Sequence, residues 1–219
     1  MRPQEYFDKI FCINLDERKD RWERCQEIFI QHNLDVQRMP GVYGASGWNS
    51  NNYPHPKKAF EGVAGGTQAH LNVLDFSFRN EIQKVLILED DVEFVENFID
   101  LFDSLSDFIP DYWEILYLGG MYRPRGMKVY RVNDHIARVQ DMMSTHAYAV
   151  KYPLTGLIYG DVVSTYPVLL DSMDGYLTKF QKIHEAYAFT TPMAWQRADH
   201  SSIQKAHRDY VNIFKSKLI

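Results

Sequence analysis

Three adjacent carboxylates, Glu89, Asp90 and Asp91, follow the strongest strand signal in the chain, the apolar run Val85 to Leu88. In an open α/β sheet, ligands bind beyond the carboxyl ends of the strands. Neighbouring carboxylates there repel each other and raise each other's pKa unless a cation lies among them. Hard oxygen ligands select Mg²⁺ or Mn²⁺, which share their coordination with phosphates. The triplet predicts a divalent metal that bridges a diphosphate; the alternative is that Asp90 and Asp91 cap the next helix.

A second polar group follows the first predicted strand, Lys9 to Leu15. In a doubly wound fold, a nucleotide base and ribose lie at the end of this strand. An acid there can accept from the base or ribose, and an arginine can face phosphate. The alternative is a solvated charged turn that opens an amphipathic helix. The donor-binding candidates here are Asn14, Leu15, Asp16, Arg18 and Arg21.

A glycine-rich stretch, residues 62 to 70, precedes a predicted helix from Thr67 towards Phe78. Glycines before a helix start let backbone amides approach an anion. The stretch contains neither a P-loop nor a dinucleotide-binding fingerprint. Gly65, Thr67 and His70 are further donor-binding candidates, although His70 taken alone fits a packing histidine better.

The elements that must position these residues alternate as strand and helix in the first half of the chain. This order predicts an α/β fold with a doubly wound sheet, to which a mixed half is appended. A loop over residues 44–58, with Trp48 and Tyr53, is long for a compact domain and predicts a mobile lid. Further strands are predicted at 36–39, 115–118, 127–132, 136–139, 145–150 and 186–195, and helices at 22–32, 94–105, 154–170 and 176–183, before a polar tail.

The bulk composition limits the possible partners. A chain of 219 residues suits one domain, with a donor-nucleotide half of about 1–120 and an acceptor half of about 121–219. A net charge of -5 argues against nucleic acid as the main partner. No run approaches the length of a membrane span, and no signal peptide is visible. With Cys12 and Cys25 as buried thiols, we expect a soluble, cytoplasmic protein without stable membrane insertion, free or at a membrane periphery.

Read together, these motifs resemble glycosyltransferase family 25, which includes lipopolysaccharide and collagen hydroxylysine galactosyltransferases. The resemblance implies a GT-A fold, with a Rossmann-like, mostly parallel central sheet flanked by helices. It also implies a nucleotide-sugar donor, usually a UDP-sugar, a divalent metal and transfer with inversion. Gly66 and Ala69 depart from the family, which usually has Cys and Ser there. The matching segments keep the family's order at 9–22, 62–74, 85–94, 114–120, 145–150, 173–177 and 196–203.

The resemblance also assigns roles to residues. Glu89, Asp90 and Asp91 correspond to the family's DxD-like motif, with Asp91 contacting the metal and Glu89 and Asp90 on the donor. Glu89 is also a candidate metal ligand. Asp174 matches the late acidic position and is the candidate base for the acceptor hydroxyl. His200 is a candidate late metal ligand; the alternative places it in a solvent-facing tail.

These assignments predict a hexosyltransferase that uses Mn²⁺ or Mg²⁺ and UDP-galactose or UDP-glucose. The expected acceptor is a hydroxyl on a cell-surface or lipopolysaccharide-type glycan. The alternatives are the same chemistry on a protein or a modified nucleic-acid base, and a sugar-nucleotide hydrolase or nucleotidyltransferase. A basic patch would suit an anionic acceptor, unless it is simply a solvated face. The patch consists of Arg123, Arg125, Lys128, Arg131 and Arg138.

Overall fold

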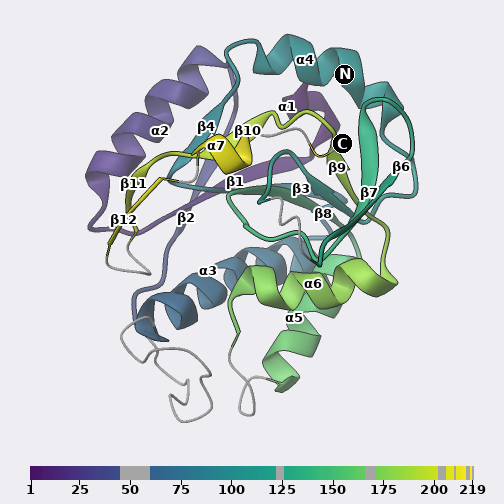
Figure 1. Cartoon of the computed structure of the whole chain (residues 1–219). Helices are drawn as coiled ribbons and strands as arrows, with labels where there is room; N and C mark the ends of the chain where they lie inside the picture. Colours follow the sequence, from purple (N-terminus) through teal and green to yellow (C-terminus); the bar gives the residue numbers. More distant parts are fainter. Residues whose placement is uncertain are drawn as a thin grey trace.

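One eight-stranded sheet, covered by helices on both faces, forms the centre of the computed structural model (Figure 1). The structure describes residues 1–44, 60–121, 126–165, 171–201, 206–209, 211–215 and 218. The strands of the sheet, in spatial order, are β2 (Gln37–Pro40), β1 (Lys9–Asn14), β3 (Lys84–Glu89), β8 (Ala147–Lys151), β5 (Ile115–Tyr117), β9 (Ala186–Phe189), β7 (Ile136–Gln140) and β6 (Lys128–Arg131).

Strand directions combine a parallel half with a mixed half. β1 runs parallel to both β2 and β3, and β5 runs parallel to β9. β8 is antiparallel to β3 and β5, and β7 is antiparallel to β9 and β6. Only β8 and β7 therefore run against the other six strands of this sheet. The predicted α/β fold, with a mostly parallel sheet flanked by helices, is confirmed.

Two layers of helices bury the two faces of the sheet. One layer is α1 (Pro3–Tyr6), α2 (Lys19–Gln31) and α4 (Phe98–Leu105), and the other is α3 (Phe60–Arg79), α5 (Leu154–Thr165) and α6 (Met173–Ile183) (Figure 1). Along β3, Val85 and Ile87 enter the core beneath α3, whereas Leu86 and Leu88 enter the core beneath α2 and α4. Successive side chains of a strand point to opposite faces, so burial on both faces explains the continuous apolar run.

Smaller elements complete the chain. A 3₁₀ turn, η3, spans Ser106–Phe108, and β4 (Val92–Phe94) pairs with β10 (Ala194–Gln196) beside the main sheet. β11 (Asp199–Ser201) pairs with β12 (Ala206–Arg208), and α7 spans Val211–Phe214, so the predicted polar tail carries regular structure. The predicted lid with Trp48 and Tyr53 lies outside the described residues, except for Gly44.

Two predicted element boundaries are wrong. Phe94 belongs to β4, and the helix that was expected to include it begins only at Phe98. The glycines at 62, 65 and 66 lie inside α3 rather than in a loop before it. A Cβ atom on Gly65 would come within 2.3 Å of the Val42 carbonyl oxygen. Gly65 is therefore needed for close packing of α3 against the chain after β2, rather than for an amide cradle.

Candidate active site

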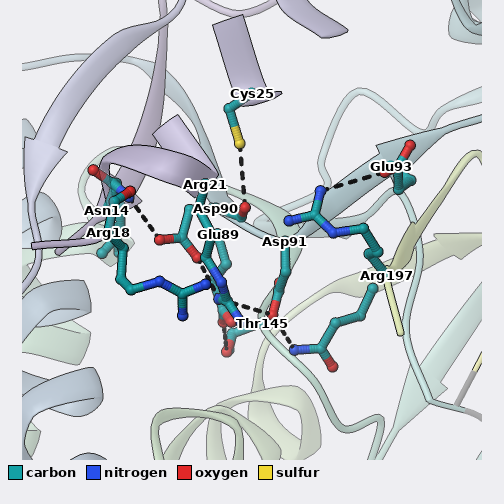
Figure 2. A network of polar contacts seen from close by, with 12 residues as sticks. Asn14, Arg18, Arg21, Cys25, Glu89, Asp90, Asp91, Glu93, Thr145 and Arg197 are labelled. Atoms are coloured by element: carbon teal, nitrogen blue, oxygen red, sulfur yellow. Dashed lines mark hydrogen bonds and ion pairs between the residues drawn. The ribbon is translucent and has the colours of Figure 1, made fainter. Parts of the chain in front are cut away.

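The carboxyl ends of β1 and β3 meet the start of β8 at one edge of the sheet. Asn14 ends β1 and Glu89 ends β3. Because β8 runs antiparallel to β3, the segment Ser144–His146 that leads into it arrives at the same edge. The backbone amide of Glu89 donates to the His146 carbonyl at 3.1 Å. The predicted acid triplet therefore lies at a strand edge bordered by three chain segments (Figure 2).

Asp90 is held in a buried ion pair. Its Oδ1 lies 2.6 Å from Arg21 Nη1, and its Oδ2 accepts a hydrogen bond from Asn14 Nδ2 at 2.8 Å. The Arg21 and Asp90 side chains are only 7% and 11% exposed. The Cys25 thiol donates to the Asp90 carbonyl at 3.3 Å. Asp90 thus connects β1, α2 and the end of β3, and both of its carboxylate oxygens are engaged.

Glu89 points to a different set of partners. Its Oε1 accepts from Thr145 Oγ1 at 2.5 Å and lies 3.2 Å from His70 Nε2. The Tyr148 hydroxyl lies 3.1 Å from His70 Nδ1. Burial raises the pKa of Tyr148 far above its usual value, so its hydroxyl keeps a proton to donate to Nδ1. This leaves Nε2–H to donate to Glu89. Burial opposes ionisation of Glu89, but the bonds from His70 and Thr145 outweigh it and lower its pKa.

Asp91 has the least complete set of partners. Its Oδ2 accepts from Gln196 Nε2 at 2.9 Å and lies 3.5 Å from Arg21 Nη1. Its Oδ1 is buried and has no hydrogen-bond partner in the described part of the chain. Burial, with the nearby negative charge of Glu89, raises the pKa of Asp91 to about 7, although Arg21 opposes the shift. Asp91 therefore offers a buried oxygen that lacks a proton donor or a cation.

Asp174 reaches the same edge from the first turn of α6. Its Oδ2 accepts from the backbone amide of Ser144 at 3.2 Å. The next residue, Thr145, binds Glu89, so one short segment connects the candidate base to the acid triplet. Ser144 has a φ of +81°, a conformation that non-glycine residues rarely adopt and that is concentrated at functional sites.

Comparison with known proteins identifies the family. The family model described as "Glycosyltransferase family 25 (LPS biosynthesis protein)" matches residues 7–160. The chain belongs to glycosyltransferase family 25. The match contains the whole acid triplet, both parallel strands that lead to it and the Ser144–His146 segment, whereas Asp174 and Gln196 lie beyond it.

Curated relatives are much longer than this chain. Procollagen galactosyltransferase 2 of Mus musculus is 28% identical over 130 residues, which covers 52% of this chain and 21% of that protein. Its Homo sapiens counterpart is 29% identical, with the same coverage. This chain therefore matches about a fifth of the length of these relatives. A solved glycosyltransferase involved in glycosylation of the major capsid of PBCV-1 matches 70% of this chain and 65% of its own, at 10% identity and a TM-score of 0.40. A TM-score this low supports no conclusion about function.

The residues present fit a divalent metal held mainly by phosphate. Among the described residues, no group of three His, Cys, Asp or Glu side chains is arranged to bind a metal ion. Mg²⁺ usually takes only one or two carboxylates and completes its shell with waters and phosphates. The unpartnered Oδ1 of Asp91 meets that requirement, and Glu89 supplies a second nearby charge. Asp90 is committed to Arg21 instead. His200 lies in β11, and its side chain is outside the described residues.

The remaining donor candidates serve mainly to support the strand ends. Asn14 is fully engaged, since Arg38 Nε donates to its Oδ1 at 2.9 Å. Arg38 also pairs with Asp16 at 2.7 Å, and Arg18 pairs with Asp20 at 2.7 Å. Leu15 packs against the chain at Gly41, where an added Cβ would lie 2.9 Å from the Leu15 amide nitrogen. Within α3, the Thr67 hydroxyl donates to the Asp171 carbonyl at 3.2 Å.

Several contacts at the site were not predicted from the sequence. Thr145 and Gln196 lie inside segments that resemble the family, but nothing in their spacing points to Glu89 or Asp91. Arg38 lies in the short strand β2 and has no motif around it. The backbone amide of Arg197 donates to the Asp91 carbonyl at 2.8 Å, which anchors β10 to the acid triplet.

The predicted basic patch is partly neutralised. Arg131 pairs with Asp134 at 3.3 Å, and Arg138 pairs with Glu185 at 3.1 Å. Lys128 is exposed, and Arg123 and Arg125 lie outside the described residues. No helix within the described ranges is both long and apolar enough to span a bilayer.

Proposed function

We propose that this chain is a metal-dependent, inverting hexosyltransferase that moves a sugar from a UDP-sugar to an acceptor hydroxyl. The observation that carries the proposal is the buried, unpartnered Oδ1 of Asp91 at the carboxyl edge of β3. A carboxylate in that state is costly unless a cation or proton reaches it. Membership of glycosyltransferase family 25 supports a donor diphosphate as the partner of that cation.

The chain's own residues divide the work of binding. Asp91 and Glu89 would hold Mn²⁺ or Mg²⁺, which acts on the diphosphate leaving group as a Lewis acid. Gln196 orients Asp91 through its Oδ2, and Thr145 and His70 orient Glu89. The Arg21–Asp90 ion pair fixes the backbone between them. Each group that supports the acids is thus itself held in place.

Asp174 is the proposed base that takes the proton of the acceptor hydroxyl. Ser144 N–H donates to its Oδ2, which fixes the carboxylate beside the segment that binds Glu89. A well-placed general base contributes about 10²–10⁴-fold in rate. Attack from the face opposite the diphosphate inverts the anomeric configuration.

Galactose is the favoured sugar and glucose the second choice, because the curated relatives are named as procollagen galactosyltransferases. The description of the family model as an LPS biosynthesis protein supports a cell-surface or lipopolysaccharide-type glycan as acceptor. The names of the relatives support a protein acceptor as the alternative. UDP as the nucleotide and a cytoplasmic location rest on the resemblance and the composition alone.

A UDP-release assay with UDP-galactose, UDP-glucose and other UDP-sugars tests the proposal, each with Mn²⁺, Mg²⁺ or EDTA. We expect release from one UDP-hexose only when both metal and an acceptor glycan are present. Asp91→Asn should lower kcat/KM by at least about 10²-fold, since it removes an electrostatic interaction at the leaving group. Asp100→Asn, on the exposed first turn of α4, is the matched control and should leave activity unchanged.

Full activity in EDTA, or in Asp91→Asn, would refute the metal assignment. Equal UDP release with and without acceptor would instead identify the rival hydrolase. The anomeric configuration of the product, read by NMR, tests inversion directly. Asp174→Asn should reduce kcat by a larger factor than it changes KM, because the base acts on the bound acceptor.

A further inference from the structure

A cavity of about 330 Å³ lies at the opposite edge of the sheet from the acid triplet. Lys84 begins β3 and Lys151 ends β8, and both line this cavity. Glu89 lies five positions after Lys84 along β3, which corresponds to about 17 Å at the rise of a strand. The volume falls at the lower end of the range for small-molecule pockets.

Lys84 and Lys151 are direct cross-strand partners in the antiparallel β3–β8 pair. Like charges placed directly opposite each other destabilise a sheet. Burial, and after it the charge of Lys84, lowers the pKa of Lys151, although the charges of Asp111 and Glu114 oppose the shift. In the described part of the chain, neither ammonium forms a salt bridge with a carboxylate. A pair of like charges that costs stability and has no carboxylate partner points to a function.

Both ammonium groups lie over aromatic rings that also line the cavity. Lys84 Nζ lies 4.3 Å from the centroid of Tyr6, and Lys151 Nζ lies 4.8 Å from that of Trp113. The Lys151 ammonium also donates to the Asp111 carbonyl. Trp113 Nε1 donates to the Tyr6 oxygen at 2.7 Å, so the Tyr6 hydroxyl keeps its own proton available. Two ammonium groups and one hydroxyl donor therefore converge on one cavity, which is a donor set for an anion.

The acidic residues Asp107 and Asp111 also line the cavity. They would repel a bare inorganic anion, but they can accept hydrogen bonds from hydroxyl groups. The lining therefore favours a ligand that carries an anionic group on one side and hydroxyls on the other. We propose that this cavity is a second binding site, distinct from the candidate active site, for an anionic sugar such as a hexose phosphate or a uronic acid. Its anionic group lies between Lys84 and Lys151, and its hydroxyls face Asp107 and Asp111.

Calorimetric titration of the whole chain in EDTA, with no nucleotide sugar present, tests this site. The probes are glucose 6-phosphate, glucuronate, glucose and inorganic phosphate. We expect one or both acidic sugars to bind at least tenfold more tightly than glucose and inorganic phosphate. Lys84→Met and Lys151→Met should each weaken that binding at least tenfold, and added salt should weaken it as well. Lys179→Met removes an exposed lysine that also lies over an aromatic ring, that of Tyr176, and should leave binding unchanged.

The thermal stability of the variants separates lost binding from lost folding. Lys84→Met should not lower the Tm of the free protein, because it removes one of two repelling charges. Asp91→Asn should bind the acidic sugar like the wild type, which distinguishes this cavity from the acid triplet. The proposal is overturned if neither acidic sugar binds, if binding survives in both lysine variants, or if inorganic phosphate binds as tightly as the sugars. These outcomes are independent of transferase activity.

Discussion

Replacing Asp91 by Asn removes one negative charge from the edge of β3 and keeps the size and shape of the side chain. Folding raises the pKa of Asp91 from 3.8 to about 7. Between these values the native state binds more protons than the unfolded chain, so stability falls as the pH rises from 3.8 to 7. At pH 8 the full cost is present, about 4 kcal/mol at 1.36 kcal/mol per pKa unit.

The neutral side chain of Asp91→Asn avoids this cost but introduces a smaller one. Its oxygen can keep the bond from Gln196, but its N–H₂ takes the place of Oδ1, which has no partner among the described residues. A buried, unsatisfied N–H costs about 1–3 kcal/mol. We therefore expect metal-free Asp91→Asn to be more stable than the wild type by about 1–3 kcal/mol at pH 8. In a chain of this length that is a Tm about 2–12 °C higher.

The neighbouring substitution Asp90→Asn should have the opposite effect. It leaves Arg21, whose side chain is only 7% exposed, without its closest counter-charge. Breaking a buried ion pair in this way costs about 3–5 kcal/mol. The remaining contact between Arg21 and Asp91, at 3.5 Å, places the expected loss near the lower end of that range.

Thermal denaturation in EDTA at pH 5 and pH 8 measures both effects. The gain in Asp91→Asn should be larger at pH 8, because native Asp91 is already protonated at pH 5. Adding Mn²⁺ at pH 8 should raise the Tm of the wild type and leave Asp91→Asn unchanged, since a ligand at 100 times its Kd stabilises by about 2.7 kcal/mol. A loss of stability in Asp91→Asn comparable to that of Asp90→Asn would refute the reasoning. Asp91 would then be a structural carboxylate like its neighbour.

Three further predictions concern the surroundings of the site. Gly65→Ala should destabilise the protein by about 1–3 kcal/mol, because the added Cβ would lie 2.3 Å from the Val42 carbonyl oxygen. Gly160→Ala, where the added Cβ on α5 would meet open space, should stabilise the protein by up to about 1 kcal/mol. Urea denaturation of the two variants measures both effects. Burial lowers the pKa of His146 from 6.5 to about 4, so below pH 6.5 the unfolded chain binds the extra proton. The contribution of His146 to stability should therefore fall by about 3 kcal/mol from pH 6.5 to pH 4, against the opposite contribution of Asp91. Denaturation of His146→Gln should lack this acid-induced loss. Tyr148→Phe removes the donor that fixes the tautomer of His70 and should weaken activation by Mn²⁺ about tenfold, measured by titrating the UDP-release assay with metal.

The sequence predicts the location of the site better than its internal contacts. The apolar run of β3 marks a strand buried on both faces, and the end of that strand locates the acid triplet. The three carboxylates differ in their hydrogen-bond and ion-pair partners, and these partners come from residues distant in sequence. Arg21 comes from a helix 69 positions before Asp90, and Gln196 comes from a strand 105 positions after Asp91. No local pattern encodes these contacts.

Two wrong boundaries have the same physical origin. Gly62, Gly65 and Gly66 together are typical of a loop, yet all three lie in α3, and at Gly65 the helix passes too close to the chain after β2 for a side chain. Phe94, Phe98 and Phe102 follow helical spacing, but Phe94 pairs with Ala194 of β10. In both cases a tertiary contact overrides the local preference, which is the usual limit of propensity.

The change of strand direction between β3 and β8 explains why the acid triplet is supported as it is. A parallel neighbour would present the end of another strand at this edge. The antiparallel β8 instead brings in the segment Ser144–His146 before it enters the sheet. That segment donates from Ser144 N–H to Asp174, donates from Thr145 to Glu89 and accepts the Glu89 amide at His146. The candidate base and a candidate metal ligand are therefore fixed to one stretch of backbone, so a displacement of this segment would move both groups together.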